Sequence, residues 1–143
     1  MKINTPLLIT IFLTCFISNA FSQSPEIEWQ NTIGGNSFDI FTTLQPTSDG
    51  GFILGGYSGS GISGDKTEGS LGGQDYWVVK LNSTGAVEWQ NTIGGSNSDR
   101  LYSLQQTQDG GYILGGSSYS GISGDKTETN TGDTIAWPYV TDY

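Results

Sequence analysis

Short hydrophobic runs alternate with turn-forming residues along most of the chain. In none of them do hydrophobic residues recur at spacings of three and four over the length of a helix, so the pattern predicts an all-β protein. Two hairpin turns are expected at residues 47–50 (Thr-Ser-Asp-Gly) and 82–85 (Asn-Ser-Thr-Gly). The predicted strands are residues 40–44, 51–57, 76–81 and 86–92.

The strand predicted at 76–81 is hydrophobic on both faces. Its side chains alternate between one face, with Trp77, Val79 and Leu81, and the other, with Tyr76 and Val78. Such a strand must be covered from both sides, whereas residues 86–92 alternate between hydrophobic and polar, as is typical of an outer, half-exposed strand. The pattern therefore predicts a four-stranded antiparallel sheet that packs between neighbours like itself.

The chain contains one unit of 60 residues written twice. Residues 28–68 return at 88–128 in the same register and without a gap, and the segment Glu-Trp-Gln-Asn-Thr-Ile-Gly-Gly at 28–35 is repeated letter for letter. A period of this length is the signature of stacked supersecondary units. The repeat divides the chain into residues 27–87 and 88–143.

Several motifs of the repeat carry a resemblance to a known family. They are Asp-Tyr-Trp-Val-Val-Lys-Leu-Asn at 75–82, Thr-Gly at 84–85, the segment 89–95 with Asp99, and Asp-Gly-Gly-Tyr-Ile-Leu-Gly-Gly at 109–116. Over residues 27–132 the chain resembles the secreted bacterial β-propeller repeats of the SBBP type, as a truncated member. The resemblance implies propeller blades, an extracellular location and no catalytic residue.

The second copy departs from the first near its end. Opposite residues 73–82, residues 133–142 share only Trp137 with Trp77, and Pro138 removes a backbone donor where an inner strand is expected. A closed propeller takes roughly four to eight blades, so about two blades predict an open or incomplete propeller. Two alternatives follow: a fragment of a longer protein, or a ring of several chains in which residues 27–32 supply an outer strand to complete the last blade.

Residues 1–20 have the pattern of a secretory signal peptide. A positively charged start precedes an apolar run at 6–17, and small residues follow at 18–20, with cleavage there or as late as Gln23. A spanning helix needs roughly 20 apolar residues, so an uncleaved membrane anchor is the less favoured alternative. The only cysteine, Cys15, lies in this segment, and the secreted form is expected to have no disulfide.

The charge of the chain restricts its partners and its chemistry. The formal net charge is −9, and the four cations after the signal segment are scattered singly, whereas nucleic-acid binding needs clustered Lys and Arg. The chain has no histidine, which excludes histidine-based metal sites and acid–base catalysis. No residue is assigned to catalysis, to a cofactor or to a metal.

Two loops nevertheless offer oxygen ligands that could bind calcium. The first loop has Asp65, Thr67 and Glu68, and the second has their copies at 125–128. The spacing is not that of an EF-hand, and the alternative is a solvated loop whose carboxylates accept hydrogen bonds from backbone amides. Calcium binding by the Asp65 and Asp125 loops is left open.

Residues 59–64 match the dinucleotide-binding fingerprint by spacing. The fingerprint must lead into a helix, and here a polar, glycine-rich segment follows. Lys66 and Thr67 also stand close to their places in a phosphate loop, but Asp65 would repel the phosphate. We interpret the segment as a wide turn that needs positive backbone angles.

The acidic residues invite comparison with glycosidases, which use two carboxylates. Ten of the 14 fall into five pairs related by the repeat: Glu28 and Glu88, Asp39 and Asp99, Asp49 and Asp109, Asp65 and Asp125, Glu68 and Glu128. A catalytic pair needs two different environments, and equivalent positions in a repeat are expected to share the same one. The chain is therefore not expected to be an enzyme.

The favoured function is a non-catalytic module for binding or structural display at the bacterial cell surface, with an unknown protein or glycan as its ligand. The alternative is a small lectin that forms a ring by homo-oligomerisation. In that alternative, Trp29 and Trp89 would stack on sugar rings, whereas packing between strands is the ordinary role of such residues.

Overall fold

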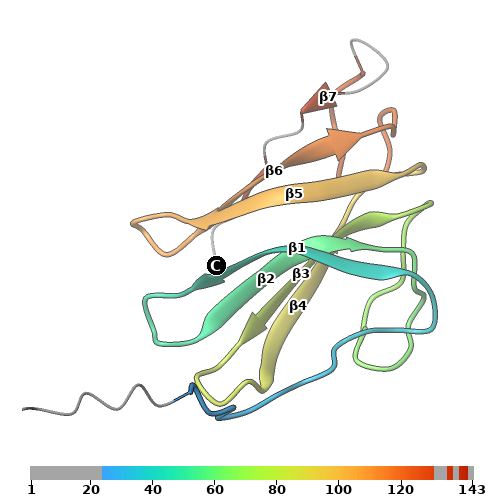
Figure 1. The fold of residues 1–143 in the computed structure, drawn as a ribbon. Helices are drawn as coiled ribbons and strands as arrows, with labels where there is room; N and C mark the ends of the chain where they lie inside the picture. Colours follow the sequence, from blue (N-terminus) through green and yellow to red (C-terminus); the bar gives the residue numbers. More distant parts are fainter. Residues whose placement is uncertain (1–23, 131–134, 137–138, 142–143) are drawn as a thin grey trace, which may run out of the picture.

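The computed structural model describes residues 24–130, 135–136 and 139–141, and over these residues the protein is all β, as predicted (Figure 1). The described part of the chain has no helix that could span a membrane. The predicted signal peptide lies outside it. The strands are β1 (Asp39–Pro46), β2 (Phe52–Ser58), β3 (Asp75–Leu81), β4 (Val87–Ile93), β5 (Asp99–Gln106), β6 (Tyr112–Ser118), β7 (Ile135–Ala136) and β8 (Tyr139–Thr141).

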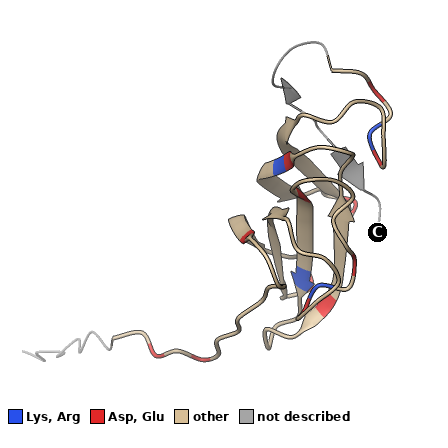
Figure 2. Ribbon diagram, turned by 90° about the vertical axis from the view of Figure 1, so that its right-hand side faces the viewer, with Lys and Arg blue, Asp and Glu red and all other residues tan. Residues whose placement is uncertain are grey.

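The strands form two antiparallel sheets that stack on each other. The first has the order β1-β2-β3-β4, and in the second β5 pairs with β6, which also pairs with β7 and β8. We call residues 39–93 the first unit and residues 99–141 the second unit. Their contact is made mainly by β5, which lies against β1 and β2 (Figure 1). Charged side chains lie mostly in loops and at strand ends (Figure 2).

Both hairpin turns of the first unit form where the sequence predicts them. The Thr47 amide donates to the Gly51 carbonyl at 2.9 Å, and the Asn82 amide donates to the Ala86 carbonyl at 2.9 Å. Gly85 adopts a φ of 81°, a conformation that glycine reaches without strain. The turn chemistry of the sequence was therefore sufficient to place these hairpins.

The strand β3 is buried on both faces, as its composition predicts. All of its residues are buried, including Asp75 and Lys80. Tyr76 and Val78 belong to a hydrophobic cluster that extends into the second unit. Trp77 belongs to a separate cluster on the opposite face of the first sheet.

A β-bulge in the first strand of each unit changes which side chains share a face. The register shifts between Phe41 and Thr43 in β1 and between Leu101 and Ser103 in β5. Because a bulge inserts one extra residue, side chains three positions apart then point to the same side. Phe41 and Leu44 consequently lie on one face, which simple alternation would not predict.

Residues 27–32, which are predicted to supply an outer strand in a ring of several chains, form no strand within the single chain. They have no strand pairing, because no described strand lies beside them to accept it. The segment packs against the first unit instead: the ring of Trp29 meets that of Phe52 edge to face at 5.7 Å, and the Asn31 amide donates to the Gly85 carbonyl at 3.0 Å. The predicted strand belongs to a ring of several chains, so it stays a prediction.

The strands β7 and β8 occupy the position of a third strand despite their divergent sequence. Ser118 pairs with Ile135, and these are the repeat equivalents of Ser58 and Asp75, which pair in the first unit. The pairs between β6 and β8 keep the same offset. Pro138, which was expected to interrupt this strand, lies outside the described residues.

Candidate functional site

Each Gly-Gly segment binds the loop of the unit that follows it. The Gly34 amide donates to Asp65 Oδ2 at 3.1 Å, and the Asp65 amide donates back to the Gly34 carbonyl at 2.9 Å. Gly94 and Asp125 make the same two contacts at 3.1 and 2.9 Å. We call this set of contacts the Gly-Gly clasp.

A second pair of carboxylates completes the Gly-Gly clasp. Asp39 Oδ2 accepts hydrogen bonds from the Gly35 amide at 2.8 Å and the Ser60 hydroxyl at 3.0 Å. In the second unit, Asp99 is fully buried, and its Oδ2 accepts from the Gly95 amide at 2.8 Å and from a serine hydroxyl. Charge-assisted hydrogen bonds of this kind are about twice as strong as neutral ones, so these aspartates hold the loops in place.

The Gly-Gly clasp has no room for a larger residue. A Cβ at Gly35 would lie 2.5 Å from Ser60 Cβ, and a Cβ at Gly95 would lie 2.6 Å from Ser120 Cβ. Both distances are far below ordinary carbon–carbon contact of about 3.5–4.0 Å. The repeated glycines are therefore required by close packing between the segment and the loop.

The carboxylates of Asp49 and Asp109 have different surroundings, contrary to the expectation from the repeat. Lys80 is 3% exposed, and its Nζ lies 2.8 Å from both Asp49 and Glu88. Burial opposes the lysine charge, but these hydrogen bonds outweigh it and raise the pKa of Lys80, while the pKa of Asp49 is held well below its usual range by Lys80. The position equivalent to Lys80 is Val140, so Asp109 lacks such a partner.

The two candidate calcium loops use their carboxylates as hydrogen-bond acceptors. Asp65 and Asp125 belong to the Gly-Gly clasp, and Glu68 accepts from the Thr92 amide at 2.6 Å. Within the described residues, no group of three or more His, Cys, Asp or Glu side chains lies close enough to hold a metal ion. The loop carboxylates thus join the loop to neighbouring backbone.

The segment that resembles a nucleotide-binding loop does not form the wide turn that the sequence predicts, because it leads into a tight turn at residues 63–66. Ser63 and Lys66 form a bridge across it, and Gly64 has a φ of 56°. The Lys66 side chain points inward and is 1% exposed; its Nζ donates to Thr92 Oγ1 at 2.5 Å and lies 5.4 Å from the centroid of the Trp77 ring. Burial lowers the pKa of Lys66, and the lysine side chain packs against the first sheet.

Asp75 is a buried acid without a counterpart in the second unit. It is 0% exposed, and its Oδ2 accepts from the Leu71 amide at 2.7 Å and the Gly72 amide at 3.3 Å. Burial raises the pKa of Asp75 to about 6, although these hydrogen bonds lower it. A raised pKa is a feature of catalytic acids, but a fully buried carboxyl cannot meet a solute without a local opening.

Trp29 and Trp89 occupy equivalent packing positions. Trp29 meets Phe52 at 5.7 Å and an angle of 61°, and Trp89 meets Tyr112 at 5.7 Å and 65°. Edge-to-face pairs of this kind stabilise aromatic packing. Each tryptophan therefore covers an aromatic residue at the start of the second strand of the following unit.

The two ends of the stack expose side chains that are buried where the units meet. Leu104 is 1% exposed, but its equivalent Leu44 is 58% exposed; Ile53 is 0% exposed, but its equivalent Ile113 is 42% exposed. The difference arises because each unit has a neighbour on one side only. We call the exposed side of the first unit the front face, and the exposed side of the second unit, which carries Ile113 and Gly115, the back face.

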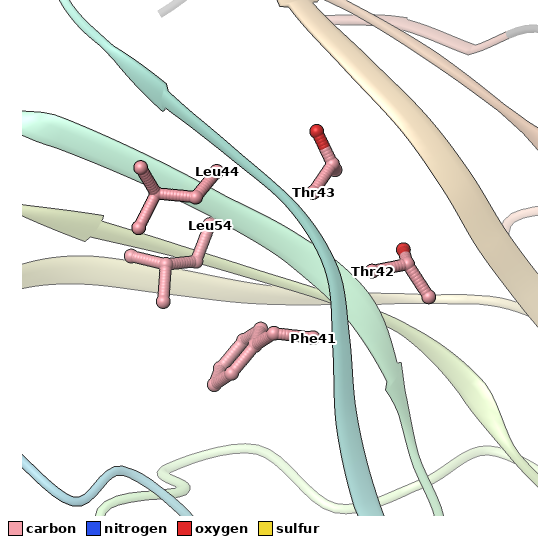
Figure 3. Close-up of a pocket in the computed structure, with 5 residues that line it drawn as sticks. All are labelled: Phe41, Thr42, Thr43, Leu44 and Leu54. Atoms are coloured by element: carbon pink, nitrogen blue, oxygen red, sulfur yellow. The ribbon is translucent and has the colours of Figure 1, made fainter.

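The front face contains an apolar hollow of about 220 Å³. Figure 3 shows Phe41, Leu44 and Leu54 on one side of β1, with Thr42 and Thr43 on the other, toward the second unit. Thr42 Oγ1 donates to the Leu101 carbonyl of β5 at 2.8 Å. The hydrophobic side of β1 therefore faces away from the second unit.

Sequence reasoning assigned no site residue and did not single out these faces. The signal that could have found them is the repeat itself, because it pairs Leu44 with a leucine that packs between units. Comparison of the chain with protein-family models and with curated proteins finds no match. The end faces are accordingly described by their geometry alone.

Proposed function

We propose that the chain is a non-catalytic, secreted β-propeller repeat module for binding or structural display at the bacterial cell surface. The observation that carries the proposal is the Gly-Gly clasp, in which repeated aspartates accept hydrogen bonds from backbone amides. The repeated aspartates, which are the candidates for catalytic residues, are thereby used as structural hydrogen-bond acceptors. The module acts by stacking, and the apolar end faces are its binding surfaces.

Two further observations support this assignment. The first unit is a four-stranded antiparallel sheet whose faces both carry hydrophobic clusters, which is typical of a blade packed between blades. The pattern of residues 1–20 supports secretion, and a chain with a formal net charge of −9 is suited to remain soluble outside the cell.

Export and the absence of turnover can be tested together. The full chain is expressed in a secreting bacterial host, and the released or surface-bound form is identified by protease treatment of intact cells and by N-terminal sequencing. The expected mature chain begins after residue 20 or as late as residue 23, and it hydrolyses no member of a broad polysaccharide panel. Retention in the cytoplasm, or hydrolysis that is lost in Asp75→Asn, would contradict the proposal.

A further inference from the structure

The front face and the back face are the two halves of the contact that joins the units inside the chain. Inside, Gly55 of the first unit lies beneath β5, where an added Cβ would be 2.7 Å from Leu101 and 3.1 Å from Leu104. At the back face, no described residue lies nearer to a Cβ added at the equivalent Gly115 than Ser103, at 4.0 Å. At the front face, Leu44 stands in place of Leu104 and is exposed.

We infer that the front face binds the back face of a second copy of this chain, head to tail. The internal contact is the template: the Leu44 side chain of one copy would lie over Gly115 of the next, as Leu104 lies over Gly55. Each face exposes a hydrophobic strand residue, Leu44 at the front and Ile113 at the back, and the charged residues of the chain lie mostly in loops and at strand ends (Figure 2). This inference rests on the stacking role proposed above.

The cation–π pair that joins the two units is not repeated at the equivalent positions of the open faces. Inside, the Arg100 guanidinium lies 5.5 Å from the Tyr57 ring centroid, joining the units by a cation–π contact. The first-unit equivalent of Arg100 is Ile40, and the second-unit equivalent of Tyr57 is Ser117, whose hydroxyl donates to the Tyr102 hydroxyl at 3.3 Å. A contact between two copies would therefore lack this cation–π pair.

The N-terminal segment has the position that a strand from a neighbouring unit would take. Gly34 is held by Asp65 as Gly94 is held by Asp125, and the tryptophan five residues earlier packs in the same way in both places. Residues 29–33 consequently lie against the first unit as the end of β4 lies against the second.

In the proposed assembly, this segment becomes the fourth strand of the neighbouring second unit. Within the first unit, Lys80 of β3 pairs with Trp89 of β4. Applying the same register, Val140 of one copy would pair with Trp29 of the next. Addition of a strand to an exposed sheet edge is a common mode of recognition, because backbone hydrogen bonds supply affinity. A head-to-tail contact of this kind produces a ring if the rotation closes and an open filament if it does not.

Light scattering and sedimentation of the full chain, purified after secretion, test the self-association. The expected result is a mass that rises with concentration to a multiple of the chain mass. Leu44→Lys should weaken association by about tenfold to a hundredfold, the factor that burial of one leucine supplies. Gly115→Val should weaken it as well, and Ile62→Lys, at a loop position that is 75% exposed, is the matched control that should not.

Cysteine cross-linking identifies the faces that meet. Mixing the single variants Leu44→Cys and Gly115→Cys should give a disulfide-linked dimer that neither variant forms alone. The double variant Gly55→Cys with Leu104→Cys should form the equivalent link within one chain, which provides the positive control.

Three results would overturn the inference: a monomer at every concentration, association that survives both Leu44→Lys and Gly115→Val, or a front face that binds only a different protein. A monomer that is exported and shows no turnover would overturn the inference alone and leave the proposed function standing.

Discussion

Adding one methyl group at Gly55 measures how tightly the two units are packed. Its Cβ would lie 2.7 Å from Leu101 Cδ2, 3.0 Å from Thr43 Cγ2 and 3.1 Å from Leu104 Cδ1. Ordinary carbon contacts are about 3.5–4.0 Å, so the strands must separate or the leucines must leave their rotamers. Overpacking of this kind costs about 1–3 kcal/mol.

The chain supplies its own control at Gly115. Among the residues that the structure describes, the same substitution there meets only Ser103, at 4.0 Å, and replacing a strand glycine by alanine stabilises by about 0.5–1 kcal/mol through the lost entropy of the unfolded chain. Gly55→Ala receives the same entropic gain, so the two variants should differ by the overpacking cost, about 1–3 kcal/mol. Gly55→Ala should be the less stable.

Urea denaturation followed by tryptophan fluorescence measures this difference. For small proteins the free energy of unfolding falls by about 1–3 kcal/mol per molar urea, so midpoints that differ by roughly 1 M are expected. Measurements at low protein concentration, with light scattering on the same samples, keep self-association from contributing. Equal midpoints for the two variants would refute the packing of β5 against β2.

Three more substitutions test the polar contacts. Gly95→Ala, whose Cβ would lie 2.6 Å from a serine Cβ, should open the Gly-Gly clasp, cost about 1–3 kcal/mol, and speed amide exchange at residues 94–97. Asp49→Asn should lower the urea midpoint at pH 7 and low salt more than Asp109→Asn, because only Asp49 pairs with Lys80. Since the pKa of Asp49 is lowered on folding, this difference should begin to shrink as the pH falls below about 4 and should continue to shrink toward the lowered pKa. The pKa of Asp75 is about 6 in the fold against 3.8 when unperturbed, so the folded state binds the additional proton, and the free energy of unfolding should decline as the pH rises from about 4 to about 6. Asp75→Asn should remove that decline, and an unchanged pH profile would contradict the assignment.

Most of the strands could be predicted because the first unit combines two independent signals. Alternation and turn chemistry agree at residues 76–92, and the structure places β3 and β4 there. The bulge at Thr42 could not be predicted, because it adds a residue without any special composition. Residues 27–32 form no strand in the single chain, because a strand exists only beside a partner, and the prediction that they complete a blade in a ring of several chains stays a prediction.

The exposure of the front face and the back face could not be predicted from the sequence, for a different reason. Leu44 and Leu104 are the same residue in equivalent strands, yet they are 58% and 1% exposed. Their difference is a property of position in the stack, because only Leu104 has a unit on its side. A repeat predicts which residues meet at a contact, and three-dimensional structure is needed to say which of those contacts is occupied.

Differences between equivalent positions of the two units also bear on the arguments against catalysis. Equivalent carboxylates were expected to have the same surroundings, but Asp49 pairs with Lys80 and Asp109 does not, so equivalence alone does not exclude two roles. The stronger argument comes from the Gly-Gly clasp, in which Asp39 and Asp65 each accept a hydrogen bond from the backbone amide of a Gly-Gly segment. A carboxylate that leaves its amide to act on a substrate would release the loop. In this chain, chemistry at the repeated aspartates would therefore compete directly with the contacts that hold the units together.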